Sequence, residues 1–473
     1  MSQINESAIK TPGVYINEIP LFPPSVAQVE TAIPAFIGYT QIAINEIGES
    51  LENVPTKIFS LKEYETYFGK AVNETGISVT VEITLDTSGA RQSMVGDADI
   101  VTPSPYTMYY NMRMYFINGG GPCYIISIGN TTDAVVIPDD YDAGLLACAA
   151  EDEPTIIVFP DAVNILSETQ YYALISSAID QCADLQDRFT LLDIHTPGTN
   201  NTTTISGFRG AFTKNESLNY AAVYYPSLRS TFDFAYSETE VDVVISTDGA
   251  PAAGVALSTL RTTETAVYNF SLAKIREKLS PTLPPSSAMA GVYAKVDASR
   301  GVWKAPANVS LNSVYDLTAK ISEAEQGGMN IDPTTGKSVN AIRMFQGKGF
   351  LVWGARTLAG NDNEWRYVNV RRFFIMVEES SKKATMQFVF EPNDANTWVK
   401  LRAMLENYLT LLWRQGALAG AKPEHAFYVR CGLGQTMTAL DILEGRLIVE
   451  IGMAAVRPAE FIILRFSHKM QES

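Results

Sequence analysis

The chain has 473 residues, of which 46% are hydrophobic and 19% are charged, and its formal net charge is -16. These values predict a globular protein with two or three domains and argue against a disordered or fibrous chain. The acidic balance argues against nucleic acid as a main partner, because phosphates are bound by basic surfaces. We expect no direct membrane insertion, since no leader-like N-terminus and no long apolar run is present.

A short strand pattern lies near the N-terminus, at residues 11–20, between two sets of breaker residues. Within it Val14 and Ile16 flank Tyr15, which is the alternation expected of a strand with two different faces. Prolines separate this strand from the rest of the chain. We therefore expect residues 1–30 to form an extended arm.

A layered α/β domain is expected over residues 31–310, in a chain of mixed α/β class. Five continuous apolar runs have the length of strands, and residues 168–185 carry apolar side chains at helical spacing. Strands this apolar are usually covered on both faces, which predicts helices packed on a sheet. The five runs are Ala35–Tyr39, Cys123–Ile128, Thr155–Pro160, Phe189–Asp193 and Ala221–Tyr225.

Two segments interrupt this pattern, at residues 74–106 and 230–265. Both are rich in Thr, Ser, Asp and Gly and alternate only weakly. Such composition is typical of surface insertions or small added subdomains. We expect both to lie on the outside of any assembly, where deleting either one would leave assembly intact.

A C-terminal domain is expected over residues 311–473. A long helix is predicted from about Asp394 to Gln415, with Gly416 as its stop. Two further strands are predicted, at residues 446–451 and 461–466. The apolar stripe of the long helix consists of Trp398, Leu401, Leu405, Tyr408 and Leu412.

Motifs for phosphate or dinucleotide binding are incomplete. Gly119-Gly120-Gly121 lacks the third glycine of the dinucleotide pattern, whose place is taken by Tyr124, and the triplet precedes a strand instead of a helix. Residues 335–338 imitate the end of a Walker loop, but Ile331 stands where its first glycine is required. A polar turn is the preferred interpretation of this second segment.

Candidate catalytic and metal-binding groups are scattered. His195, His425 and His468 have no neighbouring ligand at metal-binding spacing, and the four cysteines are far apart. The pair Glu378-Glu379 is interpreted as the end of a solvated hairpin. We therefore expect no catalytic, cofactor-binding or metal site and no cofactor, and an α/β enzyme is the least favoured alternative.

Four sets of segments, in the correct order, resemble contractile tail sheath proteins, and they cover about half of the chain. This family includes the sheaths of phage tails, R-type bacteriocins and extracellular contractile injection systems. The central set is the most specific. The segments are Thr11–Tyr15 with Ala35–Gly38, Ala290–Asp297 with Gly301–Asn308, Trp353–Leu358 with Trp365–Arg372, and Gly416–Leu418 with Ala426–Cys431 and Arg457–Ile462.

The resemblance implies a structural subunit that polymerises into a helical contractile cylinder and drives an inner tube through a target envelope. The implied partners are other copies of the chain, the inner tube protein, and baseplate and terminal cap proteins. The protein would be made in the bacterial cytoplasm and become part of a phage tail or tail-like particle, including particles that are released from the cell. The main alternative is a non-contractile capsid or baseplate component of a phage-like particle.

Two sets of residues are expected to make the contacts of such a sheath. The terminal arms should pair as strands with other subunits through backbone hydrogen bonds. Residues 340–473 carry 17 Lys and Arg against 13 Asp and Glu, so the C-terminal domain, which the family directs toward the lumen, should face an acidic tube through Lys400 and Arg414. The expected arm residues are Val14, Tyr15, Ile16, Ile462, Ile463 and Leu464.

Overall fold

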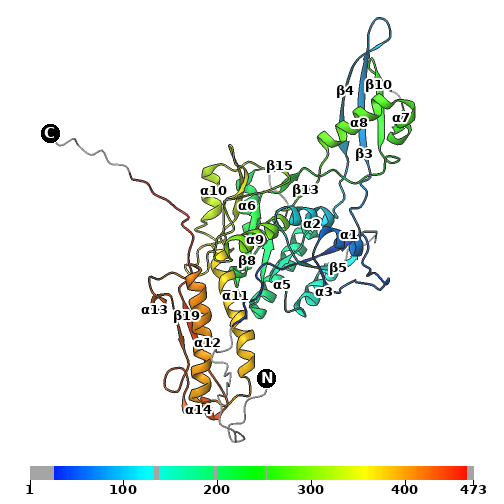
Figure 1. Cartoon of the computed structure of the whole chain (residues 1–473). Coiled ribbons are helices and arrows are strands. Elements are labelled where there is room, and N and C mark those ends of the chain that lie inside the picture. The colour runs from blue at the N-terminus through cyan, green and yellow to red at the C-terminus, as the bar shows by residue number, and fades with distance from the viewer. Residues whose placement is uncertain (1–25, 133–137, 196–199, 252, 466–473) are drawn as a thin grey trace, which may run out of the picture. The chain divides into compact units, whose positions relative to one another are not determined.

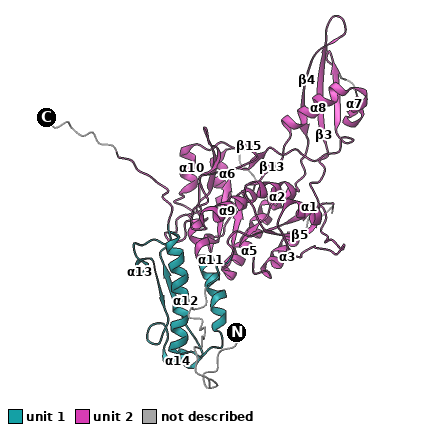
Figure 2. Cartoon of the chain, viewed as in Figure 1, with its two compact units in different colours: residues 1–29, 376–456 teal, residues 30–375, 457–473 magenta. Residues whose placement is uncertain are grey.

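The fold is described from a computed structural model. It describes residues 26–132, 138–195, 200–251 and 253–465. Contacts divide the chain into two compact units, shown in Figure 2. Unit 1 comprises residues 1–29 and 376–456, and unit 2 comprises residues 30–375 and 457–473.

Unit 2 is built on a nine-stranded sheet with the order β14-β17-β16-β8-β7-β6-β1-β5-β2. Strands β5 and β8 of this sheet are labelled in Figure 1. The six strands from β16 to β5 run parallel, and β2, β17 and β14 are antiparallel to their neighbours. The strands are β1 (Pro34–Thr40), β2 (Thr56–Ile58), β5 (Cys123–Asn130), β6 (Ile156–Val158), β7 (Phe189–Leu192), β8 (Ala221–Tyr225), β14 (Val309–Ser310), β16 (Asn340–Phe345) and β17 (Gly349–Val352).

Helices cover this sheet. Helices α3 and α5 pack together over β5, β1 and β7, and helices α2 and α9 pack together over β1, β6 and β7. All seven residues of β1 are buried, as expected of a central parallel strand. The mixed, layered α/β fold class is therefore confirmed. The helices of this part are α1 (Leu61–Phe68), α2 (Met108–Ile117), α3 (Pro138–Ala149), α4 (Ala162–Ile165), α5 (Glu168–Leu185), α6 (Asn201–Ala211), α9 (Ser286–Arg300) and α10 (Glu323–Asn330).

The two insertions form one small sheet. Strand β3, from the first insertion, pairs antiparallel with β4 and parallel with β10, from the second. Helices α7 and α8 close a separate hydrophobic core around Val79, Val81, Val243 and Leu260. The elements are β3 (Ile77–Leu85), β4 (Arg91–Ile100), β10 (Asp242–Thr247), β11 (Ala250–Pro251), β12 (Val255–Ala256), α7 (Leu257–Thr263) and α8 (Thr265–Lys278).

A three-stranded sheet of order β13-β9-β15 also lies in unit 2. Its strands are β9 (Leu228–Ser230), β13 (Thr282–Leu283) and β15 (Val314–Leu317).

Unit 1 contains the end of helix α11, the long helix α12 and a two-stranded sheet. Helix α12 begins after Asp394, whose side chain accepts a hydrogen bond from the backbone of Thr397. Gly416, just past its end, has a φ of 82°, which favours glycine as a helix stop. The elements are α11 (Val368–Thr385), α12 (Ala395–Arg414), α13 (Pro423–Ala426), β18 (Phe427–Arg430), α14 (Ala439–Leu443) and β19 (Glu450–Met453).

Two features differ from the expectations. Strands β16 and β17 join the main sheet, so contacts group the chain with unit 2 as far as Ile375 instead of dividing it near residue 310. The Glu378-Glu379 pair is not a hairpin end, because it lies inside helix α11, where Glu379 is buried and pairs with Lys382 at 3.2 Å.

Candidate strand-exchange and tube-contact sites

The two-stranded sheet of unit 1 consists of β18 and β19. Its pairing runs from Phe427 opposite Met453 to Arg430 opposite Glu450. In the part of the chain that the structure describes, no third strand joins either edge of this sheet. Unpaired backbone groups along an edge attract a further strand, and two strands alone are only marginally stable. The sheet can therefore accept a strand from another chain.

The C-terminal segment carries exposed apolar side chains. Phe461, Ile462, Ile463 and Leu464 are 67%, 77%, 78% and 72% exposed, and residues 461–465 form no strand. The predicted strand is thus not formed within the single chain. Four consecutive large apolar residues exposed to water are costly, which is expected of a segment that is covered by a partner. The corresponding N-terminal residues, Val14, Tyr15 and Ile16, lie outside the described residues.

Helix α12 buries one face and exposes another. Of the predicted apolar stripe, Trp398 is half-buried and the other residues are buried. Burial raises the pKa of Tyr408 to about 12, as expected for a phenol held in an apolar core. The predicted helix and its buried face therefore match the structure.

The predicted tube-contact residues, Lys400 and Arg414, lie on the exposed face of α12. They are 14 residues apart, which is about four helical turns, so both project from the same side. Leu411, which is 55% exposed, lies between them on this side. Arg402 lies elsewhere on the helix and pairs with Glu406 at 3.8 Å. The face thus presents two positive charges around an apolar side chain.

Two buried carboxyl groups were missed by sequence reasoning. Asp161 follows β6 and Asp193 follows β7, at the edge where α/β enzymes place their sites. Burial raises the pKa of each to about 7. Asp161 accepts a hydrogen bond from Tyr141 Oη at 2.9 Å, and a Cβ added to Gly38 would lie 2.7 Å from its Oδ1. Both carboxyl groups are therefore packed as structural groups, and the sequence signal was a polar residue directly after a buried strand.

The Walker-like segment is a turn, as predicted. The Asp332 carboxylate accepts a hydrogen bond from the backbone N–H of Thr335 at 2.8 Å. The ammonium of Lys337 is buried and donates to the carbonyl of Phe212, and burial lowers its pKa. This lysine is used inside the protein instead of being presented to a phosphate.

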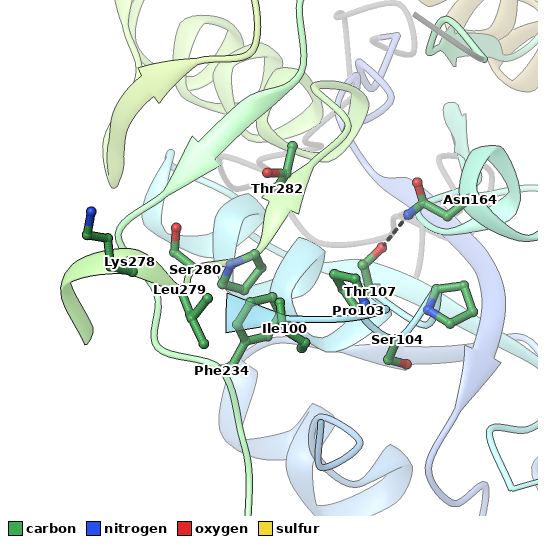
Figure 3. Close-up of a pocket in the computed structure, with 12 residues that line it drawn as sticks. Ile100, Pro103, Ser104, Thr107, Asn164, Phe234, Lys278, Leu279, Ser280 and Thr282 are labelled. Carbon is green, nitrogen blue, oxygen red and sulfur yellow. Dashed lines mark hydrogen bonds between the residues drawn. The ribbon is translucent and has the colours of Figure 1, made fainter. Parts of the chain in front are cut away.

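A cavity of about 400 Å³ lies where the segments around residues 100–107 and 278–282 meet (Figure 3). In Figure 3 the Asn164 side chain points toward Thr107, to whose Oγ1 it donates at 3.2 Å. Lys278 is the one titratable side chain among the residues that line this cavity. The residues that line this cavity therefore do not include the paired acid and base that proton-transfer catalysis uses.

Within the described ranges, the chain lacks both metal-ligating clusters and membrane-spanning helices. Within them, His, Cys, Asp and Glu side chains form no group that could hold a metal ion. Likewise, among the helices that the structure describes, none combines the length and apolarity needed to cross a bilayer.

In the part of the chain that the structure describes, an open sheet edge and an exposed apolar segment are features typical of a chain that pairs with other chains. The family model of the phage tail sheath C-terminal domain matches residues 360–469. A chain of the anti-feeding prophage (AFP) baseplate is 33% identical, with 98% of this chain and 100% of that chain covered and a TM-score of 0.65. A chain of the contracted sheath complex of the extracellular contractile injection system PVC is 30% identical, with 98% of each chain covered and a TM-score of 0.64.

The chain belongs to the family of contractile sheath proteins, and the family prediction made from the sequence motifs is confirmed. The tail sheath protein of Vibrio phage KVP40 is 23% identical over 188 residues, which is 39% of this chain and 26% of that protein. The chain thus matches about a quarter of the length of this curated relative.

Proposed function

We propose that the chain polymerises into a helical cylinder around an inner tube and drives this tube through a target envelope by contraction. The observation that carries the proposal is that one chain has both a segment suited to pair as a strand and a sheet that can accept a strand. Residues 461–464 expose apolar side chains, and among the described residues no third strand pairs with β18 or β19. A head-to-tail contact of this kind, if it does not close on itself, generates a helical filament.

Strand exchange explains how such a cylinder can change length without coming apart. Backbone hydrogen bonds between an arm and a neighbouring sheet hold subunits together while the folded units reorient. The extended cylinder would be a kinetically trapped state, and the contracted one would have the lower free energy. Contraction then needs no nucleotide, and we propose that the chain has no catalytic role, as suits relatives that are structural sheath proteins.

The inner tube is the proposed partner of helix α12. Lys400 and Arg414 would meet acidic groups of the tube, each contact contributing about 1 kcal/mol or less because it is exposed. Weak contacts suit a tube that must slide when the sheath contracts. The similarity to a chain of the AFP baseplate assembly supports a baseplate partner as well. We propose that terminal caps complete the particle, which is assembled after synthesis in the bacterial cytoplasm.

Electron microscopy of the purified assembly tests this proposal. We expect hollow helical cylinders, and a closed shell or a persistent monomer would instead favour a non-contractile capsid or baseplate role. A chain lacking residues 1–22 should remain folded and soluble but form no cylinders, because the deletion removes the strand that we propose links one subunit to the next. Normal cylinders from this truncated chain would contradict the proposed arm exchange.

A further inference from the structure

Both ends of unit 2 leave its fold next to a buried arginine. Arg356 and Arg372 are 3% and 4% exposed, and each lies in the segments that resemble the sheath family. A buried guanidinium is costly unless its charge and its hydrogen-bond donors are satisfied. Each of these arginines donates hydrogen bonds to the root of one arm as well as to groups inside unit 2. By the root we mean the residue where an arm joins unit 2.

The root of the C-terminal arm is Glu460. Its carboxylate accepts two hydrogen bonds from Arg356, at 2.9 Å from Nε and 2.6 Å from Nη2. Asn330 Nδ2 donates to the same carboxylate at 2.6 Å and Tyr367 Oη at 3.1 Å. Burial alone would raise the pKa of Glu460, but these hydrogen bonds outweigh it and the pKa is lowered. The next residue, Phe461, is already 67% exposed.

The root of the N-terminal arm is Thr31, three residues before β1. Its Oγ1 donates to Asp297 Oδ2 at 2.7 Å, and its carbonyl accepts from Arg372 Nη2 at 2.7 Å. Arg372 and Asp297 form an ion pair at 2.6 Å whose side chains are 3% and 6% exposed. The Thr31 carbonyl also accepts from Thr155 Oγ1 at 2.9 Å. Helices α9 and α11 and the strand that follows Thr155 thus meet at this one residue.

We propose that Arg356 and Arg372 are positioning residues that anchor the two arms to unit 2, so that a pull on either arm is passed to the folded unit at a fixed point. This inference rests on the arm exchange proposed above. A bidentate arginine pair fixes direction as well as distance, which a lysine or a single hydrogen bond does not. When its root is anchored, an arm can pair with a neighbouring subunit. The anchor keeps a pull on the arm from separating the adjoining residues from unit 2.

The C-terminal anchor is tested with Glu460→Gln in the full chain. A fluorophore on Ile463→Cys reports the mobility of the arm in the dissociated subunit, and it can be attached selectively because all four native cysteines are buried. We expect lower fluorescence anisotropy and a concentration threshold for cylinder assembly raised about tenfold or more, together with a lower melting temperature, because Glu460→Gln leaves the buried charge of Arg356 unpaired. Tyr367→Phe, which leaves no buried charge unpaired, separates the two effects and must lower the anisotropy at a melting temperature close to that of the wild type.

Glu238→Gln is the matched control. Glu238 also accepts hydrogen bonds from an arginine and a tyrosine, Arg261 at 2.8 Å and Tyr268 at 2.9 Å, but it lies beside the small sheet. If Glu460→Gln and this control give the same anisotropy and the same threshold, the anchor does not exist. If the wild-type chain forms no cylinders, the proposed function is wrong. The anisotropy measurement still tests whether Glu460 anchors the C-terminal arm.

The N-terminal anchor is tested in the same way with Arg372→Lys and a fluorophore on Ala27→Cys. Lysine keeps the charge beside Asp297 but cannot bind the carboxylate and the Thr31 carbonyl together. We expect lower anisotropy at position 27 and a raised assembly threshold. Because the backbone N–H of Val29 also donates to Ser380 Oγ at 3.1 Å, the label is compared in a Ser380→Ala background. An anisotropy that Arg372→Lys leaves unchanged in that background would overturn this half of the proposal.

Discussion

Asp193 accepts a hydrogen bond of 2.9 Å through Oδ1 from the backbone N–H of Ser286, the residue with which helix α9 begins. The carboxyl group is fully buried, and burial raises its pKa to about 7. Below this pH the group is neutral and joins the end of β7 to α9 without a buried charge.

The pH dependence of stability follows from this shift. Between pH ~4 and ~7 the folded chain holds a proton on Asp193 that the unfolded chain releases, so the free energy of unfolding falls as pH rises through this window. Asp161 acts in the same direction over the same window. Asp193→Asn keeps an acceptor for Ser286 and should raise the free energy of unfolding at pH 8 by about 1 kcal/mol or more relative to wild type.

Urea unfolding of the dissociated subunit from pH 5 to pH 8 measures this effect. The exposed Asp180→Asn is the control, since its side chain is 59% exposed. Asp193→Asn should reduce the slope of stability against pH, leaving the part that Asp161 contributes. An unchanged slope would contradict a protonated Asp193 at neutral pH.

Proline in the C-terminal arm should block assembly. Ile463→Pro removes a backbone N–H from a segment that must pair as a strand, whereas Ile463→Ala keeps it. Because Ile463 is 78% exposed in the single chain, neither change should alter the melting temperature. Cylinder yield, measured by sedimentation and electron microscopy, should be lost for proline and only reduced for alanine. Equal yields for the two variants would mean that residue 463 makes no backbone pairing.

Charge reversal on helix α12 should weaken the tube contact. Lys400→Glu with Arg414→Glu should lower the yield of tube-filled extended particles several-fold, and added salt should lower the wild-type yield in the same direction. Lys62→Glu with Lys348→Glu, at exposed sites in unit 2, makes the same change in net charge and serves as control. Wild-type yield from the α12 variant would mean that the tube binds elsewhere.

The small sheet changes the expected effect of deleting an insertion. Residues 77–100 and 241–279 share one hydrophobic core, so removing either segment alone should expose the other and cause aggregation. Removing both together, with short Gly-Ser joins, should leave the melting temperature and cylinder assembly close to wild type. Solubility of the three variants decides the question, and a soluble single deletion would show that one half folds without the other.

Much of the fold could be predicted because its signals are local. The five apolar runs became β1, β5, β6, β7 and β8, and residues 168–185 became α5 with the same bounds. The long helix was found because Asp394 caps it, Gly416 stops it and its apolar residues recur at helical spacing. Each of these features is visible within a window of about 20 residues.

The incorrect predictions arose where local sequence signals for different structures conflict, or where a contact involves a distant segment. At Glu378-Glu379 the charged run Ser-Ser-Lys-Lys suggested a turn, although Val370, Phe373 and Val377 recur at helical spacing and bury the helix. The predicted strand at residues 446–451 begins only at Glu450, because Arg446 pairs with Asp441 after helix α14.

Contacts between distant segments carry no local signal. The pairing of β3 with β10 joins Ser78 to Asp242, and the anchor joins Arg356 to Glu460. The strand pairing could be inferred only from an unpaired strand edge, and the Arg356–Glu460 contact only from a buried charge. Neither feature is visible in the sequence. The same limit applies to the arms and the tube face, whose proposed partners are on other chains.

The parallel pairing of β3 with β10 also bears on protein engineering. A designer who wishes to transplant this small sheet into another sheath protein must move residues 77–100 and 241–279 together, because they share one hydrophobic core. Fusion of a reporter or a cell-binding peptide is better placed in the β3–β4 turn, where Gly89 has open space around it and residues 86–90 are exposed. Natural exchange of this small sheet between sheath genes would likewise require two coordinated recombination events, which predicts that it is inherited intact or lost whole.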